Sequence, residues 1–275
     1  SGGLRLIKLV AFDMDGTFLR SDNTYDVERF EKIYRALQEK DIKVVVISGN
    51  QYAQLASFFP KHQSELIIVS ENGALIFEGD KLLREAKITR TEIEKVLDVL
   101  VSENLENATT LCGLHSAYLL KSAPKQYKEE IAIYYHALKE ISNFQDLPED
   151  DFVKLALLVP EEKTDQLLEK LNQVTGQLVQ AVSSGHGSID IIQRGVHKGS
   201  ALELLSQHFG IAPQEMMAFG DGGNDLEMLA YVGHSYAMAN APEKVKKTAK
   251  YQAPSNQESG VLEILERKVV KKGLS

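Results

Sequence analysis

Acidic, hydroxyl, amide and lysine side chains stand at four places in this chain, each at the end of an apolar run or at the start of a helical pattern. Taken alone, each place is ordinary, because Asp-x-Asp-Gly also marks turns and calcium loops. A lysine in a first helical turn is usually solvated. Together, and in this order, the four places predict one shared site. The residues are Asp13, Asp15, Ser48, Gly49, Lys198, Asp221, Asn224 and Asp225.

The acids predict a metal site, and the other groups predict a site for an anion. Carboxylates that are clustered and desolvated repel one another unless a cation lies among them. Hard oxygen ligands of this kind suit Mg2+. Ser48, Lys198 and Asn224 offer hydrogen-bond donors or positive charge, and the backbone amides near Gly16 and Gly49 add further donors. An anion beside a carboxylate-bound Mg2+ is most simply a phosphoryl group.

Two nearby carboxylates are also what a phosphoryl-transfer reaction through an enzyme ester needs. One carboxylate attacks phosphorus and forms an aspartyl-phosphate that water later hydrolyses. The second, as a carboxylic acid, protonates the leaving alkoxide and then activates water, which is typically worth about 10²–10⁴-fold in rate. The protein otherwise supplies positioning and charge neutralisation. The residues therefore predict a phosphatase, with a phosphomutase as the alternative that uses the same nucleophile.

A parallel sheet would bring these side chains together. Apolar, β-branched runs alternate with helical patterns at both ends of the chain, which predicts parallel strands covered on both faces. Right-handed crossovers place the carboxyl ends of such strands at one edge, where ligands bind. We expect an α/β protein with a doubly wound, mostly parallel, Rossmann-like core. The segments are 6–12, 26–40, 42–48, 50–59 and 65–70, then 198–210, 215–220, 224–232, 235–239, 241–249 and 258–268.

The middle of the chain has a different pattern. Strands there come in adjacent, partly alternating pairs, which predicts an antiparallel α+β unit. We place this inserted cap domain at 84–192, with linkers at 78–81 and 193–196, so that 1–83 plus 193–275 form the catalytic core. The expected helices are 91–105, 124–141 and 161–176, and the expected strands lie within 108–120, 152–159, 178–182 and 188–192.

Composition excludes several classes of protein. The chain has 275 residues, a net charge of −8 and 43% hydrophobic residues, which fits an ordinary globular protein and argues against a general nucleic-acid binder. No apolar run approaches the roughly 20 residues that span a bilayer. The single cysteine, Cys112, cannot form an internal disulfide and suits a reducing compartment. We expect a cytoplasmic monomer or small homo-oligomer that acts on a small phosphorylated metabolite and binds neither nucleic acid nor membrane.

Four motifs of the chain resemble those of a known family. FDMDGT, SGN, HKG and GDGGND resemble, in this order, the motifs of the haloacid dehalogenase superfamily, and the insert resembles the C2 cap of its Cof-type branch. The stretches SGNQY, FFP, ENGAL, CGLHSAY and YAMANA are most similar to its bacterial sugar phosphatases. The resemblance covers the whole chain. It implies a Mg2+-dependent phosphatase that hydrolyses small phosphomonoesters, above all sugar phosphates.

The resemblance also implies roles for individual residues. Asp13 would be the nucleophile and a metal ligand, and Asp15 the general acid and base that binds the metal through its backbone carbonyl. Asp221 would be a metal ligand, and Asp225 would bind the metal or support it. Ser48, Gly49, Lys198 and Asn224 would hold the phosphate. Asn50 stands where many Cof-type relatives have arginine, which removes a fixed cation near the entrance of the site.

The cap and the substrate leave alternatives. His115, Ser116 and Tyr118 in CGLHSAY either contact sugar hydroxyls or are turn and core residues of the cap sheet. Cys112 is expected to be a small buried apolar residue. Besides a phosphomutase, a phosphatase for nucleotide or flavin phosphates and a phospho-accepting signalling module are alternatives. Such signalling modules, however, usually carry the acceptor aspartate on a later strand and have neither the GDGGND turn nor a large insert.

Overall fold

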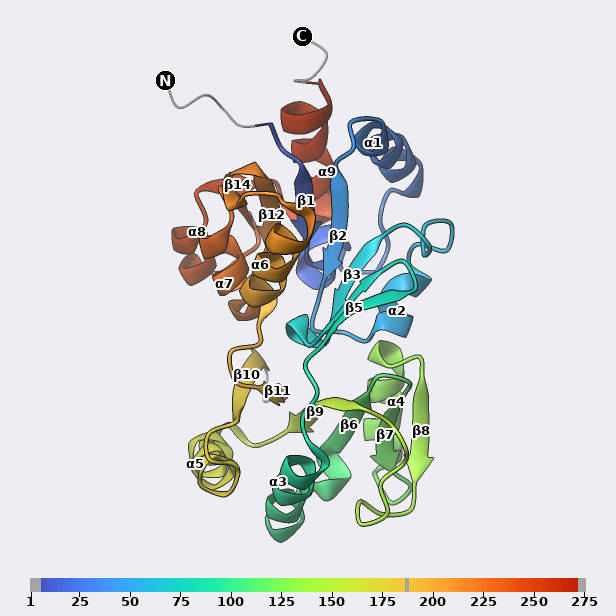
Figure 1. Cartoon of the computed structure of the whole chain (residues 1–275), viewed down its shortest axis with the longest axis vertical. Helices are drawn as coiled ribbons and strands as arrows, with labels where there is room; N and C mark the ends of the chain where they lie inside the picture. The colour runs from blue at the N-terminus through green and yellow to red at the C-terminus, as the bar shows by residue number, and fades with distance from the viewer. Residues whose placement is uncertain (1–5, 186–187, 272–275) are drawn as a thin grey trace.

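The computed structural model describes residues 6–185 and 188–271, and in it two β-sheets lie at opposite ends of the long axis of the molecule (Figure 1). The larger sheet combines strands from both ends of the chain, and the smaller sheet comes from the residues between them. The expected α/β class with a doubly wound core is confirmed.

The larger sheet has the strand order β14-β13-β12-β1-β2-β3-β4-β5. Strands β14 to β3 are all parallel, and β4 and β5 continue the sheet in antiparallel fashion. The chain moves outward from β1 in both directions, so the topological switch point lies between β1 and β12. The bounds are β1 Leu9–Phe12, β2 Lys43–Ile47, β3 Ile67–Ser70, β4 Leu75–Glu78, β5 Lys81–Glu85, β12 Met216–Gly220, β13 His234–Met238 and β14 Tyr251–Ala253.

Helices cover both faces of this sheet, as continuous apolar strands require. Val10 and Phe12 of β1 pack into one cluster with residues of α1, α2 and α9. Leu9 and Ala11 point to the opposite face and pack with residues of α6, α7 and α8. The bounds are α1 Val27–Glu39, α2 Tyr52–Ser57, α6 Lys198–Phe209, α7 Leu226–Tyr231, α8 Glu243–Thr248 and α9 Gly260–Ile264.

The expected linker at 78–81 is wrong. These residues form the turn between β4 and β5, where Gly79 has a φ of +60° that suits a tight turn. The apolar pattern of 75–77 therefore belongs to the larger sheet, and the chain passes to the second sheet only after β5.

The smaller sheet is mostly antiparallel, in the order β10-β11-β9-β6-β7-β8. Helices α3 and α5 pack on one of its faces through a cluster that includes Leu97, Leu111, Leu155 and Leu171. Helix α4 packs on the opposite face. The bounds are α3 Arg90–Ser102, β6 Thr109–Gly113, β7 Ala117–Leu120, α4 Lys125–Tyr134, β8 Leu138–Ile141, β9 Phe152–Leu158, α5 Thr164–Thr175, β10 Val179–Gly185 and β11 Ser188–Gln193.

The helix expected over 124–141 is too long. Helix α4 ends at Tyr134, and residues 138–141 form β8, which runs parallel to β7. Tyr135 leaves the helix and buries its ring in a small cluster with Cys112 and Ala117. The side chain of Gln51 accepts from Ala137 N and donates to Ala137 O, so these extended residues are also tied to the larger unit.

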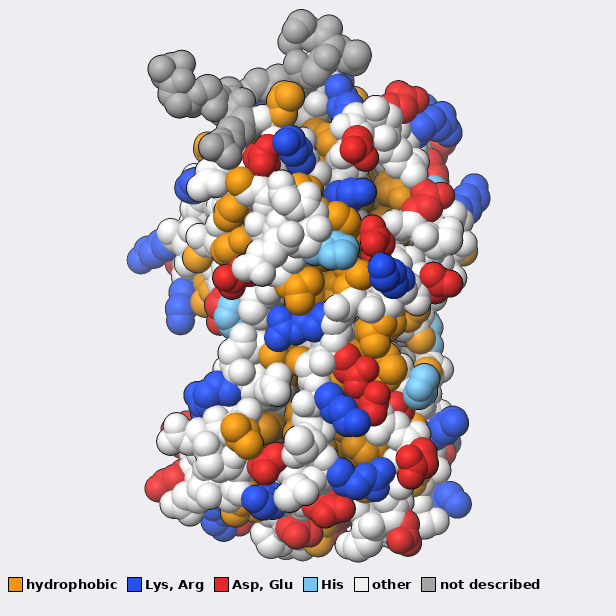
Figure 2. Space-filling view, in the orientation of Figure 1, with side chains coloured by type: hydrophobic (Ala, Val, Ile, Leu, Met, Phe, Trp, Pro, Cys, Tyr) orange, Lys and Arg blue, Asp and Glu red, His pale blue; other side chains and the backbone are white. Residues whose placement is uncertain are grey.

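The surface carries both signs of charge. The space-filling view shows Lys, Arg, Asp and Glu side chains interspersed over the visible face and a narrowing of the molecule between the two sheets (Figure 2). Among the described residues, no helix combines the length and the apolar character that crossing a membrane requires.

Candidate active site

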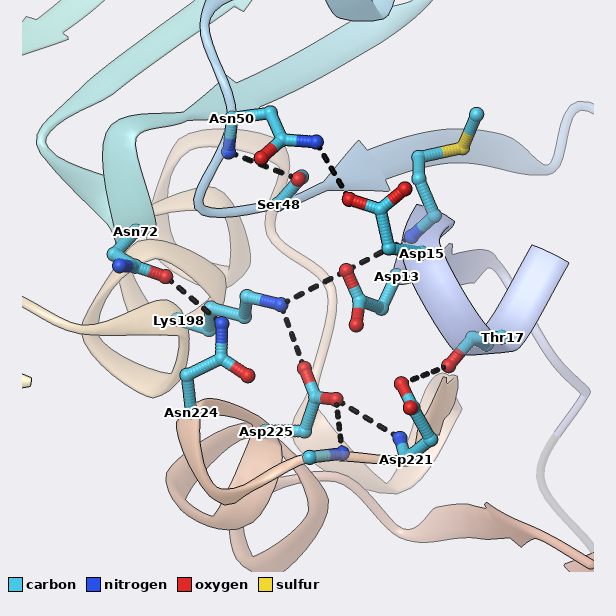
Figure 3. A network of polar contacts seen from close by, with 12 residues as sticks. Asp13, Asp15, Thr17, Ser48, Asn50, Asn72, Lys198, Asp221, Asn224 and Asp225 are labelled. Atoms are coloured by element: carbon cyan, nitrogen blue, oxygen red, sulfur yellow. Dashed lines mark hydrogen bonds and ion pairs between the residues drawn. The ribbon is translucent and has the colours of Figure 1, made fainter. Parts of the chain in front are cut away.

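The four motifs meet at the carboxyl edge of the larger sheet. Asp13 follows β1, Ser48 follows β2, and Asp221 follows β12, the three strands that lie side by side at the switch point. Lys198 is the first residue of α6. Two short turns complete the set: η1 (Met14–Phe18) carries Asp15, and η6 (Gly223–Asp225) carries Asn224. Figure 3 shows these side chains directed toward one another.

Three carboxylates form a compact acidic cluster. Oxygen atoms of Asp13, Asp221 and Asp225 all lie within 4.8 Å of one another. Burial raises the pKa of Asp13 well above its usual range, with Asp225 adding to the shift and Lys198 opposing it. Burial also raises the pKa of Asp221, and Asp225 again adds to it. A hard divalent cation would offset both the cost of burying these carboxylates and the repulsion between them, so this donor set fits Mg2+.

Lys198 brings a positive charge to the acidic cluster. Its side chain is completely buried, and Nζ lies 2.6 Å from Asp225 Oδ1 and 3.2 Å from Asp13 Oδ1. Burial alone would lower the pKa of Lys198, but Asp13 and Asp225 outweigh it and raise the pKa, so the ammonium stays charged. A buried charge held at this place suits an anion that approaches Asp13.

Asp225 serves mainly as a scaffold for the loop that carries Asp221. Its Oδ1 accepts from Lys198, and its Oδ2 accepts from the backbone amides of Asp221 and Gly222 at 2.9 Å and 3.0 Å. Asp221 in turn accepts from the Thr17 hydroxyl at 2.8 Å through Oδ1. Asp13 and Asp221 therefore offer oxygens with fewer competing partners than Asp225 does.

Asp15 has a different environment from the acids of the cluster. Its side chain is exposed and lines the pocket, and Oδ2 accepts a 2.7 Å hydrogen bond from Asn50 Nδ2 (Figure 3). In the sequence Asn50 is notable only because it replaces the arginine of many relatives. In the structure it contacts Asp15. An amide at this position orients the carboxylate without bringing a charge to it.

Polar groups that suit an anion lie on the other side of Asp13. Ser48 is buried, and its Oγ accepts from Asn50 N at 3.0 Å. Asn224 donates from Nδ2 to Asn72 Oδ1 at 3.0 Å. Asn72 has a φ of +56°, as the turn typical of its Asn-Gly sequence requires. The same residue also lines the pocket.

The structure does not bring His115, Ser116 and Tyr118 to this site. The backbone amides of His115 and Ser116 and the hydroxyl of Tyr118 all donate to the carboxylate of Asp150. Tyr118 lies 3% exposed in the cluster under α3 and α5, on the face of the smaller sheet away from the pocket. Because side chains alternate along a strand, this register turns Tyr118 into the cap core. His115, Ser116 and Tyr118 are therefore turn and core residues, and the predicted contact with sugar hydroxyls is wrong.

Other residues of the smaller sheet line the pocket instead. A cavity of about 930 Å3 opens in front of Asp13 and Asp15 and extends to residues of α4, β9 and β11. No sequence motif marks Lys154 and Asp190 of this wall, although each carries a visible signal, a lone charge inside an apolar strand. The main side chains of this wall are Tyr127, Ile131, Tyr134, Tyr135, Lys154 and Asp190.

Comparisons with known proteins agree with this arrangement. A family model described as haloacid dehalogenase-like hydrolase matches residues 10–265. The chain is 41% identical over 261 residues to a 5-amino-6-(5-phospho-D-ribitylamino)uracil phosphatase of Escherichia coli (strain K12), covering 95% of this chain and 96% of that protein. An HMP-PP phosphatase of Klebsiella pneumoniae (strain 342) is 27% identical over 247 residues, with 88% and 87% covered. A crystal structure from Streptococcus mutans UA159 has a TM-score of 0.89 and 39% identity, covering 98% of this chain and 100% of that one.

Proposed function

This chain belongs to the haloacid dehalogenase-like hydrolases and is a phosphatase of that family; from this premise we propose that it uses Mg2+ and hydrolyses small phosphomonoesters through an aspartyl-phosphate. The observation that carries the proposal is the convergence of Asp13, Asp221 and Asp225 oxygens within 4.8 Å, beside the buried ammonium of Lys198. Such a set holds charge of both signs around one carboxylate, as a phosphoryl group requires.

In the proposed reaction Asp13 attacks phosphorus, and the bond between phosphorus and the ester oxygen breaks. Asp15 gives its proton to the departing oxygen and then removes a proton from the water that hydrolyses the aspartyl-phosphate. Its exposed position and its hydrogen bond from Asn50 support this assignment. Ser48, Gly49, Lys198 and Asn224 hold the phosphate oxygens.

Asp13, Asp221 and the backbone carbonyl of Asp15 would hold the Mg2+. The ion, when bound, neutralises charge on the phosphoryl oxygens and lowers the repulsion between Asp13 and the phosphate. Asp225 supports the ion through its bonds to the backbone of Asp221 and Gly222 rather than as a ligand of its own. We also assign catalysis to the core and substrate selection to the cap; because β5 ends at Glu85 and β11 ends at Gln193, the cap expected at 84–192 is placed at 86–193.

The substrate class follows from the pocket and from the relatives. We expect a small phosphorylated metabolite, with sugar phosphates as the first candidate class. A flavin-precursor phosphate is a second candidate, because a relative of 41% identity is named for the dephosphorylation of 5-amino-6-(5-phospho-D-ribitylamino)uracil. Tyr134, which lines the pocket and is 43% exposed, supports a leaving group with a planar ring. The single buried thiol of Cys112 is consistent with a place in the cytoplasm.

A phosphate-release screen tests the proposal. Sugar phosphates, nucleotides, flavin phosphates and 5-amino-6-(5-phospho-D-ribitylamino)uracil are each incubated with the protein, with Mg2+ and with a chelator. We expect release from at least one of them, loss of release on chelation, and no release by Asp13→Asn. Release that is indifferent to the chelator, or full activity of Asp13→Asn, would refute the proposed chemistry.

A further inference from the structure

Lys154 is a charged residue of the smaller sheet whose charged end reaches the larger unit. It lies on β9 and is 1% exposed. Its Nζ donates to the backbone oxygen of Gly49 at 2.9 Å and lies 3.1 Å from Glu71 Oε2. Gly49 is the residue after Ser48, so this lysine contacts the loop that is assigned to the phosphate.

The partner of Lys154 is held in an unusual backbone. Glu71 is 1% exposed and begins the turn η2 (Glu71–Gly73), and both Glu71 and Asn72 have left-handed φ values, +54° and +56°. Burial raises the pKa of Glu71, and Lys154 opposes that shift. A buried ion pair seldom stabilises a fold more than apolar residues would, and left-handed residues cost free energy as well. A functional constraint would explain why the chain keeps both the buried ion pair and the left-handed backbone of Glu71 and Asn72.

A second branch of contacts leads from the same lysine to the other phosphate loop. Lys154 Nζ lies 4.0 Å from Asp190 Oδ2 on β11, and that oxygen accepts from Asn72 Nδ2 at 2.9 Å. Asn72 Oδ1 accepts from Asn224. The described contacts therefore run without a break from β9 and β11 to Gly49 on one side and to Asn224 on the other.

We propose that Lys154 is a positioning residue that sets the backbone of residues 48–50, and through Asp190 and Asn72 the side chain of Asn224, in the geometry that binds phosphate. The inference rests on the proposed function and adds that the smaller sheet shapes the phosphate site itself. Lys154 does not touch the substrate in this role. It affects the binding of the phosphate group, and this effect does not depend on the leaving group.

The role predicts an effect on inorganic phosphate, which has no leaving group. The Kd of inorganic phosphate is measured by calorimetry with Mg2+, together with kcat and KM for a substrate found in the screen. For Lys154→Met we expect the Kd of phosphate to rise at least tenfold and kcat/KM to fall about 100-fold, the loss that a displacement of about 1 Å typically causes.

A double variant separates positioning from stability. Lys154→Met leaves the Glu71 carboxylate buried without its cation, whereas Lys154→Met with Glu71→Gln removes both charges. We expect the double variant to regain part of the lost thermal stability, because the Asp190 carboxylate still lacks its cation, but to regain neither phosphate affinity nor kcat. Lys128→Met is the matched control, because Lys128 Nζ also binds a backbone oxygen, that of Lys121, and a carboxylate, that of Glu140, within the smaller unit. It should change the Kd of phosphate by less than twofold.

The outcomes are distinguishable. A double variant with wild-type kcat and phosphate affinity would overturn the positioning role, because the lysine would then matter for folding alone. An unchanged Kd of phosphate with a raised KM would also overturn it, in favour of a direct contact with the leaving group. Wild-type protein that binds phosphate but releases none from any substrate would refute the proposed function alone. Wild-type protein that binds no phosphate would refute both.

Discussion

Replacing Gly16 by alanine should remove most of the activity and little of the stability. Gly16 has a φ of +75°, and an alanine Cβ there would stand 2.2 Å from Asp221 Oδ2 and 2.9 Å from Asp221 Cγ. The Asp221 carboxylate must retreat by about 1.2 Å to reach an ordinary contact of 3.4 Å. That movement separates it from the Thr17 hydroxyl and from Asp13.

The size of the two effects follows from this geometry. A left-handed φ costs a non-glycine residue about 1–2 kcal/mol in the free energy of unfolding, which lowers the Tm by about 2–8 °C. Misplacing a reacting group by about 1 Å costs about 10²-fold in rate. We therefore expect kcat/KM to fall about 100-fold while the protein remains folded at 25 °C.

A second glycine provides the control for backbone strain. Gly210 has a φ of +65° at the end of α6, and an added Cβ would meet no atom within 4 Å. Gly210→Ala should lose as much Tm as Gly16→Ala and keep wild-type kcat/KM. Both quantities are measured at saturating Mg2+ by phosphate release and thermal denaturation. Activity of Gly16→Ala within threefold of wild type would refute the assignment of Asp221 to the site.

Three further predictions concern single side chains. Asp15→Asn should lower kcat by about 10²–10⁴-fold; kcat/KM, which reports only the step in which the leaving group departs, should fall less on an aryl phosphate whose leaving group needs no proton, and an equal loss of kcat/KM on both substrates would contradict proton donation. Burial and Asp151 raise the pKa of Glu85 to about 7. The contribution of protonated Glu85 to stability is therefore fully present below about pH 4.5 and is lost as the pH rises to about 7. The Tm of wild type should therefore fall relative to that of Glu85→Gln between pH 5 and pH 8, and a constant difference would count against this pair. Burial raises the pKa of the Cys112 thiol, with Glu71 adding to it, so iodoacetamide at pH 8 should label Cys112 only after unfolding; rapid labelling of the native protein would contradict the burial.

Much of the larger sheet could be predicted because its strands are continuous apolar runs bounded by helical patterns. The alternation of Leu9 and Ala11 with Val10 and Phe12 between two clusters is what such a run requires. The hairpin β4–β5 was missed because its turn resembles a linker. The end of α4 was missed because Tyr135 and Ala137 are held extended by tertiary contacts, with Cys112 and Gln51, that no local pattern reveals.

The candidate site divides in the same way. Motif residues at strand ends could be predicted together because topology alone brings strand ends to one edge. The wall of the pocket could not, because it depends on how two sheets face each other. Tyr118 and Lys154 lie in strands of similar apolar character, and only the register decides that one enters the cap core and the other reaches Gly49. The sequence shows only that Asn50 lacks the positive charge of an arginine. Its contact with Asp15 depends on a loop conformation that the sequence does not reveal.

The central place of β1 has a consequence for the synthesis of the protein. β1 pairs with β2 on one side and with β12 on the other, and the bonded residues Thr17 and Asp221 are 204 positions apart. A ribosome therefore completes the whole smaller sheet before β12 emerges. Until then the nascent chain presents β1 as an open edge, and such edges invite aggregation. A chain that stops before Met216 would carry its cap but neither a closed core nor a catalytic centre.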